Sequence, residues 1–387
     1  MIKISTENLV TPSKISDRIY LLDTSLRDGE QTPGVSYTVE NKIKIARQLD
    51  MLGVDVIEAG FPITSEGELE SVKKIAKENL SAEICGLAMC NKKSIDLALD
   101  CDVDRIHVFI ATSNLHLEQK LKMTKEDALK QAVEQVEYAK SHGVKIEFSA
   151  EDATRSDLDF VIKIFQAVED AGADVLDIAD TVGVLTPSSM RVLANKIVSS
   201  VKIPVSVHCH NDFGLAVANS LAAIEVGAKQ IHVVVNGMGE RAGNASLESV
   251  AMGLKHLLKT NTGIKLDKLM ETSSLLQNLS GIYMPPNTPI IGENAFAHES
   301  GIHVHGMLSN PATYEPIDPT EININRKYVV GKHSGTHSIK NKLNQLGFTY
   351  TEAQLKTIIY KVKLLGDQSQ KISDEKLKSI VNETINK

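Results

Sequence analysis

The chain has 387 residues, of which 42% are hydrophobic and 24% are charged, and its formal net charge is −7. This length exceeds one ordinary domain and suits a large barrel with an appendage. The sequence has no basic stripe and no apolar run long enough to span a bilayer, so we expect neither nucleic acid nor a membrane as partner. The N-terminal residues lack the apolar region of a secretory signal, and the four cysteines show no CxxC spacing. We therefore expect a cytoplasmic protein with free thiols.

A short apolar, β-rich run recurs along the chain, each time followed by a helix-length pattern of polar and apolar residues. The predicted strands are Tyr20–Leu26, Val54–Gly60, Ala82–Ala88, Arg105–Ala111, Lys145–Ala150, Val175–Asp180, Pro204–His208 and Gln230–Asn236. The predicted helices between them are 38–52, 65–79, 124–142, 156–171, 187–200, 213–227 and 246–259, and the third unit has only a short one. Eight βα units in a row predict an α/β fold, the closed parallel TIM (βα)8 barrel, rather than an open sheet.

The pattern changes after residue 260. Residues 261–295 end in a stretch rich in Pro, Asn and Gly, MPPNTPIIGENA, which is typical of a linker or an extended lid. Residues 335–365 and 373–386 again show a helical period. We therefore assign 1–260 to a catalytic barrel, 261–295 to a linker or lid, and 296–387 to helical C-terminal subdomains.

The run Val205-Ser-Val-His208-Cys-His210 places two histidines on one face of a predicted strand, because successive side chains of a strand alternate. An isolated HxH is more often a buried and a solvent-exposed histidine that happen to be close. Here the first predicted strand is followed by Asp28, a hard oxygen ligand. Strand ends meet at one face of a barrel, so the three side chains could hold a divalent metal and leave positions open for substrate. Mg, Mn and Zn all suit such a site.

Two loops at the same face carry further polar candidates. Arg27 adds fixed positive charge that could polarise a carbonyl or stabilise an alkoxide, although a surface Arg-Asp pair is the plain alternative. After the eighth strand, the glycine-rich loop 236–244 has the wrong glycine order for a dinucleotide fingerprint. In that loop Asn244 can offer an amide oxygen to the metal and Glu240 can take part in proton transfer. The alternative is a tight turn that merely needs its glycines.

The middle strands also carry polar residues where a barrel interior is usually branched and apolar. His107 lies inside the fourth predicted strand, where a histidine is more often a satisfied core residue. Glu147, Ser149 and Glu151 share one face of the fifth strand by alternation, and Thr181 follows the sixth. We expect these residues to line a pocket.

At this point the motifs DTSLRDGEQTPG, FIATSNLHLEQKLKMT, FSAEDATRSD, SVHCHNDFGLAVANSLAAIEVGA, NGMGERAGNASLE and GENAFAHESGIH resemble the 2-isopropylmalate, homocitrate and citramalate synthase family over residues 20–335. The resemblance implies a TIM barrel followed by helical subdomains, and a reaction that joins acetyl-CoA to a 2-oxo acid. By motif, it implies a catalytic arginine at Arg27, substrate-lining positions at His107, Ser149, Glu151 and Thr181, and metal ligands at Asp28, His208, His210 and Asn244. It also implies that the neighbouring subunit of a homodimer brings His303, with Tyr314 beside it.

The resemblance implies a metal-dependent Claisen-type acyltransferase with thioester hydrolysis. His303, Tyr314 and Glu240 are the candidates for its proton transfers. The negative charge of Glu147 would oppose an anionic substrate tail, which favours 2-oxoisovalerate, giving 2-isopropylmalate for leucine biosynthesis. The alternatives are homocitrate synthase acting on 2-oxoglutarate, citramalate synthase acting on pyruvate, an HMG-CoA-type lyase, and a non-catalytic metal-binding barrel. We expect the form that lacks a leucine-binding C-terminal regulatory domain.

Overall fold

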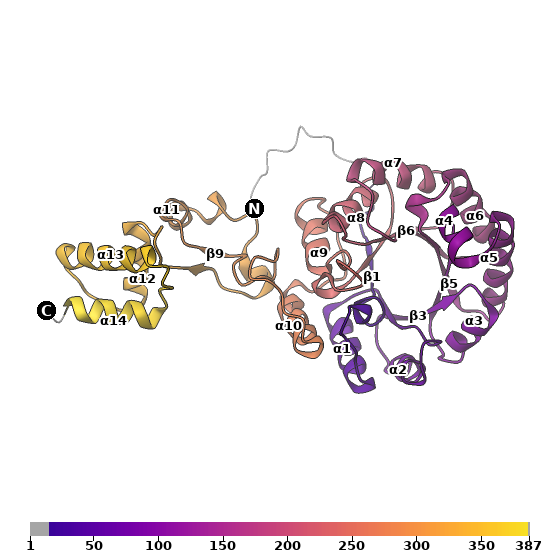
Figure 1. Cartoon of the computed structure of the whole chain (residues 1–387), viewed down its shortest axis with the longest axis horizontal. Helices are drawn as coiled ribbons and strands as arrows, with labels where there is room; N and C mark the ends of the chain where they lie inside the picture. Colours follow the sequence, from indigo (N-terminus) through magenta and orange to yellow (C-terminus); the bar gives the residue numbers. More distant parts are fainter. Residues whose placement is uncertain (1–14, 386–387) are drawn as a thin grey trace. The chain divides into compact units, whose positions relative to one another are not determined.

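A computed structural model describes residues 15–385 of the chain. The N-terminal segment in which we expect no secretory signal lies outside these residues, as do residues 386–387. The described chain forms two compact units, 15–284 and 285–385. In the first unit, eight parallel strands pair in chain order and the last pairs with the first (Figure 1). This closed barrel confirms the predicted fold.

The eight barrel strands alternate with helices, as the sequence pattern predicts. The strands are Tyr20–Asp23 (β1), Val56–Gly60 (β2), Glu83–Met89 (β3), Arg105–Ala111 (β4), Lys145–Glu151 (β5), Val175–Asp180 (β6), Val205–Cys209 (β7) and Gln230–Val233 (β8). The main helices are Val39–Leu52 (α1), Glu66–Ala76 (α2), Lys92–Leu99 (α3), Lys125–Lys140 (α5), Leu158–Asp170 (α6), Pro187–Val198 (α7), Ala216–Ile224 (α8) and Leu247–His256 (α9). Between β4 and α5 lie a short helix, Asn114–His116 (α4), and a π-helical turn, Leu117–Leu121.

Local sequence signals set the ends of these helices. The hydroxyl of Thr38 accepts a hydrogen bond from the Asn41 amide at the start of α1. At its end, Gly53 adopts a left-handed conformation with φ of 93°. Thr124 and Asp127 form a reciprocal capping box at the start of α5. Such caps satisfy terminal backbone groups that have no partner within the helix.

The structure corrects the predicted linker, because residues 261–295 contain a helix that belongs to the barrel unit. Helix α10, Leu269–Ser280, packs against α1, where the Gln48 side-chain amide donates to the Thr272 hydroxyl at 2.9 Å. Leu269 and Leu276, two turns apart, are buried. The Pro- and Gly-rich residues that indicated a linker begin only at 285, so their signal concealed the apolar helix face that precedes them.

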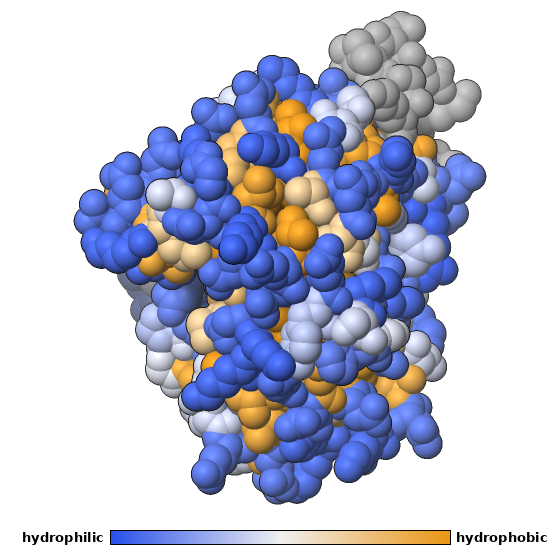
Figure 2. Space-filling model, turned by 90° about the vertical axis from the view of Figure 1, so that its right-hand side faces the viewer, coloured by the Kyte–Doolittle hydropathy of each residue, from blue (hydrophilic) through white to orange (hydrophobic). Residues whose placement is uncertain are grey.

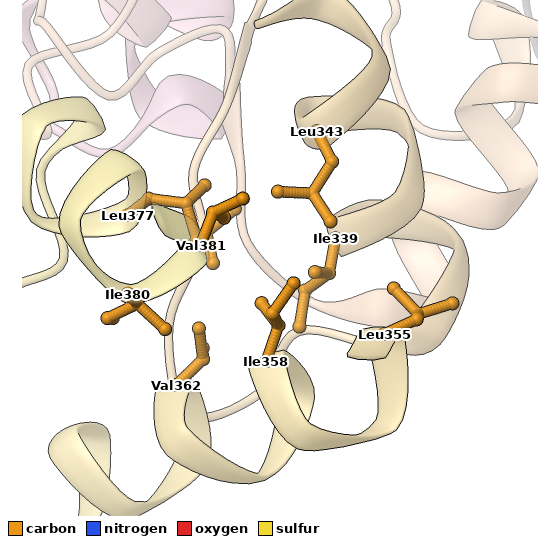
Figure 3. Close-up of a cluster of buried hydrophobic side chains, with 9 residues drawn as sticks. Ile339, Leu343, Leu355, Ile358, Val362, Leu377, Ile380 and Val381 are labelled. Carbon is orange, nitrogen blue, oxygen red and sulfur yellow. The ribbon is translucent and has the colours of Figure 1, made fainter. Parts of the chain in front are cut away.

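The second unit confirms the helical C-terminal region. It contains helices Gly301–Ser309 (α11), Thr336–Gln345 (α12), Glu352–Asp367 (α13) and Asp374–Ile385 (α14), with a two-stranded parallel sheet of Ala297–His298 (β9) and Lys327–Tyr328 (β10). Helices α12, α13 and α14 bury one apolar cluster, shown in Figure 3. Its labelled members are Ile339, Leu343, Leu355, Ile358, Val362, Leu377, Ile380 and Val381. This unit therefore has a core of its own.

The outer surface carries the polar residues of the helices. The face shown in Figure 2 is mainly hydrophilic, with hydrophobic residues in scattered groups. Scattered apolar residues of this kind are normal on a folded protein. Among residues 15–385, no helix is long and apolar enough to cross a membrane.

The barrel interior is unusually polar, since such interiors are normally filled with branched apolar side chains. An apolar cluster of Leu22, Val56 and Cys85 lies on the side of β1 to β3. On the side of β4 and β5, the guanidinium of Arg105 contacts the carboxylate of Glu147 at 2.9 Å. Charged groups removed from water are costly unless they are paired, so this interior has to be held by a matched network. That network lies directly beneath the candidate site.

Candidate active site and metal centre

Asp28, His208 and His210 converge at the carboxyl ends of β1 and β7. Nε2 of His208 lies 3.3 Å from Asp28 Oδ2 and 3.3 Å from His210 Nε2. Nε2 of His210 lies 3.7 Å from the same Asp28 oxygen. All three side chains are buried. The side chain of the intervening Cys209 is also buried, but on the opposite face of β7, because successive side chains of a strand alternate. Three potential ligand atoms therefore lie within 4.8 Å of one another.

The surroundings of Asn244, the fourth predicted ligand, test whether a metal ion fits this site. Asn244 is 2% exposed, and its side-chain nitrogen donates to the Met238 carbonyl at 3.1 Å. Its Oδ1 is buried and has no hydrogen-bond partner in the structure. A buried amide oxygen without a partner is costly unless something else binds it. Two imidazoles, a carboxylate and this oxygen form a donor set that fits Mg, Mn or Zn.

Gly239 lets the loop after β8 approach this site. Its φ of +136° lies in the region that L-residues rarely adopt. A Cβ at this position would collide with the Asn244 amide and lie 3.0 Å from Asp28 Oδ1. The glycine is therefore required by a close approach of backbone to the ligands, in addition to the turn itself.

The charges around the cluster leave its ligands ready to bind a cation. Burial raises the pKa of Asp28, but Arg27 and the two imidazoles more than offset this and hold it well below its usual range. Burial, together with His208, lowers the pKa of His210 to about 4. Near neutral pH the site therefore offers a carboxylate and a neutral imidazole at His210.

Arg27 is held rigidly between two carboxylates. Its Nη1 lies 2.8 Å from Asp28 Oδ2, and its Nε lies 2.6 Å from Glu58 Oε2. The other oxygen of Glu58 lies 2.7 Å from Nδ1 of His107. Although burial raises the pKa of Glu58, Arg27 and His107 lower it to about 2. The guanidinium is therefore a fixed cation beside the candidate metal ligands.

These contacts continue around the barrel. Nε2 of His107 lies 2.6 Å from Ser149 Oγ, which donates in turn to Asp177. Asp177 Oδ1 lies 3.9 Å from Nε2 of His232, whose Nδ1 lies 3.3 Å from Nδ1 of His208. We call this closed set the interior ring. Its members are Arg27, Asp28, Glu58, His107, Ser149, Asp177, His208 and His232.

Glu147 shares a face with Ser149 and Glu151, as predicted, but it is fully buried and does not line the pocket. Its carboxylate contacts Arg105 at 2.9 Å and Nε2 of His232 at 2.7 Å. The expectation that its charge faces the substrate tail is therefore wrong, because the carboxylate is paired with Arg105 and His232 below the pocket. Burial lowers the pKa of His232, but Asp177 and Glu147 outweigh it and raise this pKa to about 9.

Above the ring is a cavity of about 300 Å³. Its lining includes nine of the predicted site residues: Arg27, Asp28, His107, Ser149, Glu151, Thr181, His208, His210 and Glu240. Glu151 is paired with Lys120 at 2.6 Å, and Thr181 Oγ1 accepts from the Asp152 amide at 2.8 Å. The sequence analysis missed part of the lining, namely Gln31, Phe61, Leu87, Phe109, Asp177, Ala179 and Arg241. The alternation of strand residues on β3, β4 and β6 could have identified four of them.

The remaining two predicted residues lie in the second unit. His303 is on α11, and Tyr314 follows it in the chain. Their rings are tilted by 31° with centroids 4.2 Å apart. The structure therefore brings these two residues together as a pair within the second unit.

Comparison with known proteins agrees with this architecture. Residues 18–276 match the family model described as HMGL-like, and residues 290–370 match the one described as homocitrate synthase post-HMGL domain-like. A probable 2-isopropylmalate synthase of Methanopyrus kandleri is 58% identical over 92% of this chain and 71% of its own length. The 2-isopropylmalate synthase of Methanocaldococcus jannaschii is 53% identical over 100% of this chain and 75% of its own length.

Among solved structures, the HMG-CoA lyase of Bacillus subtilis superposes with a TM-score of 0.64 at 19% identity. It covers 71% of this chain and 97% of its own, and at this identity the likeness concerns the fold alone. The match to the HMGL-like model extends over most of the chain, and a homocitrate synthase and a citramalate synthase are 50% and 52% identical to the chain. The chain therefore belongs to the HMGL-like family and, within it, to the enzymes comprising the 2-isopropylmalate, homocitrate and citramalate synthases.

Proposed function

We propose that this enzyme condenses acetyl-CoA with 2-oxoisovalerate to give 2-isopropylmalate. Condensation of acetyl-CoA with a 2-oxo acid rests on the family and on the relatives named above. The choice of 2-oxoisovalerate rests on the pocket wall, where Phe61, Leu87, Phe109 and Ala179 provide apolar surface. A branched apolar side chain gains from burial against such a wall, whereas a carboxylate loses hydration there.

The cations of the pocket support the same choice. Among the residues that line it, the two arginines are both already paired. Arg27 lies between Asp28 and Glu58, and Arg241 contacts Asp212 at 2.7 Å and donates to the Thr181 carbonyl at 2.8 Å. A second substrate carboxylate, as in 2-oxoglutarate, would have to compete with these partners. This disfavours the homocitrate alternative.

Asp28, His208, His210 and Asn244 would hold a divalent cation, which when bound polarises the keto group of the 2-oxo acid. Arg27 supplies positive charge where the keto oxygen becomes an alkoxide. A base removes a proton from the acetyl methyl carbon, which then forms a C–C bond to the keto carbon, and the alkoxide takes up a proton. Water then cleaves the thioester C–S bond and releases coenzyme A as a thiol.

We assign these proton transfers to His303, Tyr314 and Glu240. Glu240 lines the barrel pocket, while the rings of His303 and Tyr314 lie against each other in the second unit. We further propose that the chain acts as a homodimer in which residues 296–387 of one copy bring this pair to the barrel of the other. The support is the family resemblance of the motif around His303 and the placement of that motif outside the barrel.

A coenzyme A release assay tests the substrate. The wild type is incubated with acetyl-CoA, Mg²⁺ or Mn²⁺, and pyruvate, 2-oxoisovalerate or 2-oxoglutarate in turn. We expect the highest kcat/KM with 2-oxoisovalerate. A preference for 2-oxoglutarate or pyruvate would contradict the proposal in favour of homocitrate or citramalate synthesis, and no release with any acid would refute condensation.

A pair of β3 variants tests the role of the apolar wall. Leu87→Ala should lower kcat/KM for 2-oxoisovalerate by roughly tenfold or more and change that for pyruvate much less, because lost methylenes weaken binding of the branched tail. Met89→Ala is the matched control, since Met89 follows on the same strand face and does not line the pocket. Equal losses for both acids would show that Leu87 does not contact the tail.

A further inference from the structure

We propose that His232, held by Glu147, is a positioning residue that orients the metal ligand His208 and fixes the tautomer in which it binds. This inference rests on the metal site of the proposed function. It starts from the two nitrogens of His208, which face different partners. Nε2 faces Asp28 and His210, both at 3.3 Å, so it is the nitrogen directed at the metal. Nδ1 faces Nδ1 of His232 at 3.3 Å, away from the metal.

The other ring nitrogen of His232 faces a carboxylate that is itself held in place. Nε2 of His232 lies 2.7 Å from Glu147 Oε1. That carboxylate is anchored on its other side by Arg105 Nη1 at 2.9 Å, and Gln230 donates to Oε1 at 2.7 Å. Arg105 and Gln230 are themselves nearly buried, at 7% and 4% exposure. Glu147 is thus a fixed hydrogen-bond acceptor for His232.

Proton counting then selects one arrangement for the metal-bound state. A metal on Nε2 of His208 requires a lone pair there, so the proton of that neutral ring sits on Nδ1. Two nitrogens in hydrogen-bond contact share a single proton, so Nδ1 of His232 must accept it. The second proton that the raised pKa of His232 gives this ring in the metal-free chain must therefore leave when the metal binds. The proton of His232 then lies on Nε2 and is donated to Glu147. Every donor in the chain from His208 to Glu147 has an acceptor.

The other metal histidine provides an internal contrast. Nδ1 of His210 is buried and has no hydrogen-bond partner in the structure. Of the two imidazoles, His208 is therefore the one whose ring angle is fixed by neighbouring side chains. Outer partners of this kind typically contribute 10–100-fold to metal affinity. Such partners are usually a carboxylate or a carbonyl, whereas here an imidazole is interposed between ligand and carboxylate.

Metal affinity, measured without substrate, tests the proposal. Mn²⁺ is titrated into each protein, and free Mn²⁺ is followed by its electron paramagnetic resonance signal. We expect His232→Phe to raise the Kd for Mn²⁺ by about 10–100-fold. His232→Gln should restore much of the affinity, because its amide can accept from His208 and donate to Glu147. Gln230→Met is the matched control: it removes another donor to Glu147 and a 3.4 Å contact with Nε2 of His232, but it leaves the His232 ring in place between His208 and Glu147.

The outcomes separate the inference from the function on which it rests. If the wild type does not bind Mn²⁺, the metal site itself is refuted. If the wild type binds and His232→Phe binds within twofold of it, the positioning role is overturned. The same follows if His232→Gln binds no better than His232→Phe, or if Gln230→Met loses as much affinity as His232→Phe. Should His232→Phe not fold, ¹⁵N-histidine NMR of the wild type with Zn²⁺ decides. A proton on Nδ1 of His208 supports the proposal, and a proton on its Nε2 overturns it.

Discussion

Lys42 is only 1% exposed, yet its ammonium group joins three segments of the barrel. Nζ lies 2.6 Å from Glu30 Oε2 and 2.5 Å from Glu68 Oε2, and it donates to the Leu26 carbonyl at 3.0 Å. The two carboxylate oxygens therefore lie no more than about 5 Å apart. In Lys42→Met they would face each other without a cation, which costs about 3 kcal/mol at an effective dielectric constant of 20.

That repulsion agrees with the loss of about 3–5 kcal/mol expected when one partner of a buried pair is removed. For a unit of this size, a loss of about 3–5 kcal/mol corresponds to a fall in Tm of roughly 5–9 °C. The other oxygen of Glu68 accepts the Phe61 amide at 2.8 Å, and Phe61 lines the pocket, so KM for the 2-oxo acid should rise as well.

Denaturant unfolding and steady-state kinetics measure the two effects of Lys42→Met. The control is the triple variant Lys42→Met/Glu30→Gln/Glu68→Gln, which removes the repelling charges while keeping the side-chain lengths. We expect it to recover more than half of the lost stability. A loss below about 1 kcal/mol in the single variant would refute the electrostatic reasoning, because exposed pairs already account for that much. Equal losses in both variants would show that packing of the lysine stem dominates.

Three further outcomes follow from the structure. His210→Ala should lose the bound metal and nearly all activity while unfolding cooperatively; full activity after chelator treatment would contradict the metal site. Arg27→Ala and His303→Ala, each nearly inactive, should regain activity when their subunits exchange, and inactive heterodimers would exclude a shared site. Burial raises the pKa of Asp23 and of Glu248 to about 7, so the folded chain keeps protons that unfolded carboxyls release near pH 4. Stability should therefore fall from about pH 4 to pH 7, and Glu248→Gln should flatten the fall seen by thermal unfolding; an unchanged slope would reject the assignment.

The barrel could be predicted from the sequence because its signal is local and repeated. Each strand is a short apolar run, and each helix has caps such as Thr38 and Gly53, so eight units identify the topology without any long-range information. The candidate metal ligands could be predicted for the same reason. His208 and His210 alternate on one strand, and Asp28 follows the first strand end.

The interior partners could not be found in this way, because their role depends on register between strands. Glu58, Asp177 and His232 each lie between two apolar neighbours in their strands, and a polar residue at such a position does not reveal what it faces. Pairings such as His107 beside Glu147 are known only once the strands are aligned. Helix α10 was missed for a different reason. Residues 261–295 were assigned as one segment, and the Pro- and Gly-rich residues at its end indicated a linker for the whole of it.

The interior ring also has a consequence for how the chain is made. Its members come from the loop after β1, from β2, and from every strand from β4 to β8, so it spans the sequence from Arg27 to His232. No fragment that ends before β8 can close it, however well its own βα units have formed. On the ribosome, the nascent chain therefore lacks a complete ring until the last strand has emerged and docked beside the first. Capture of a metal ion at the proposed site would then report that the barrel has closed, even while the residues after β8 are still being made.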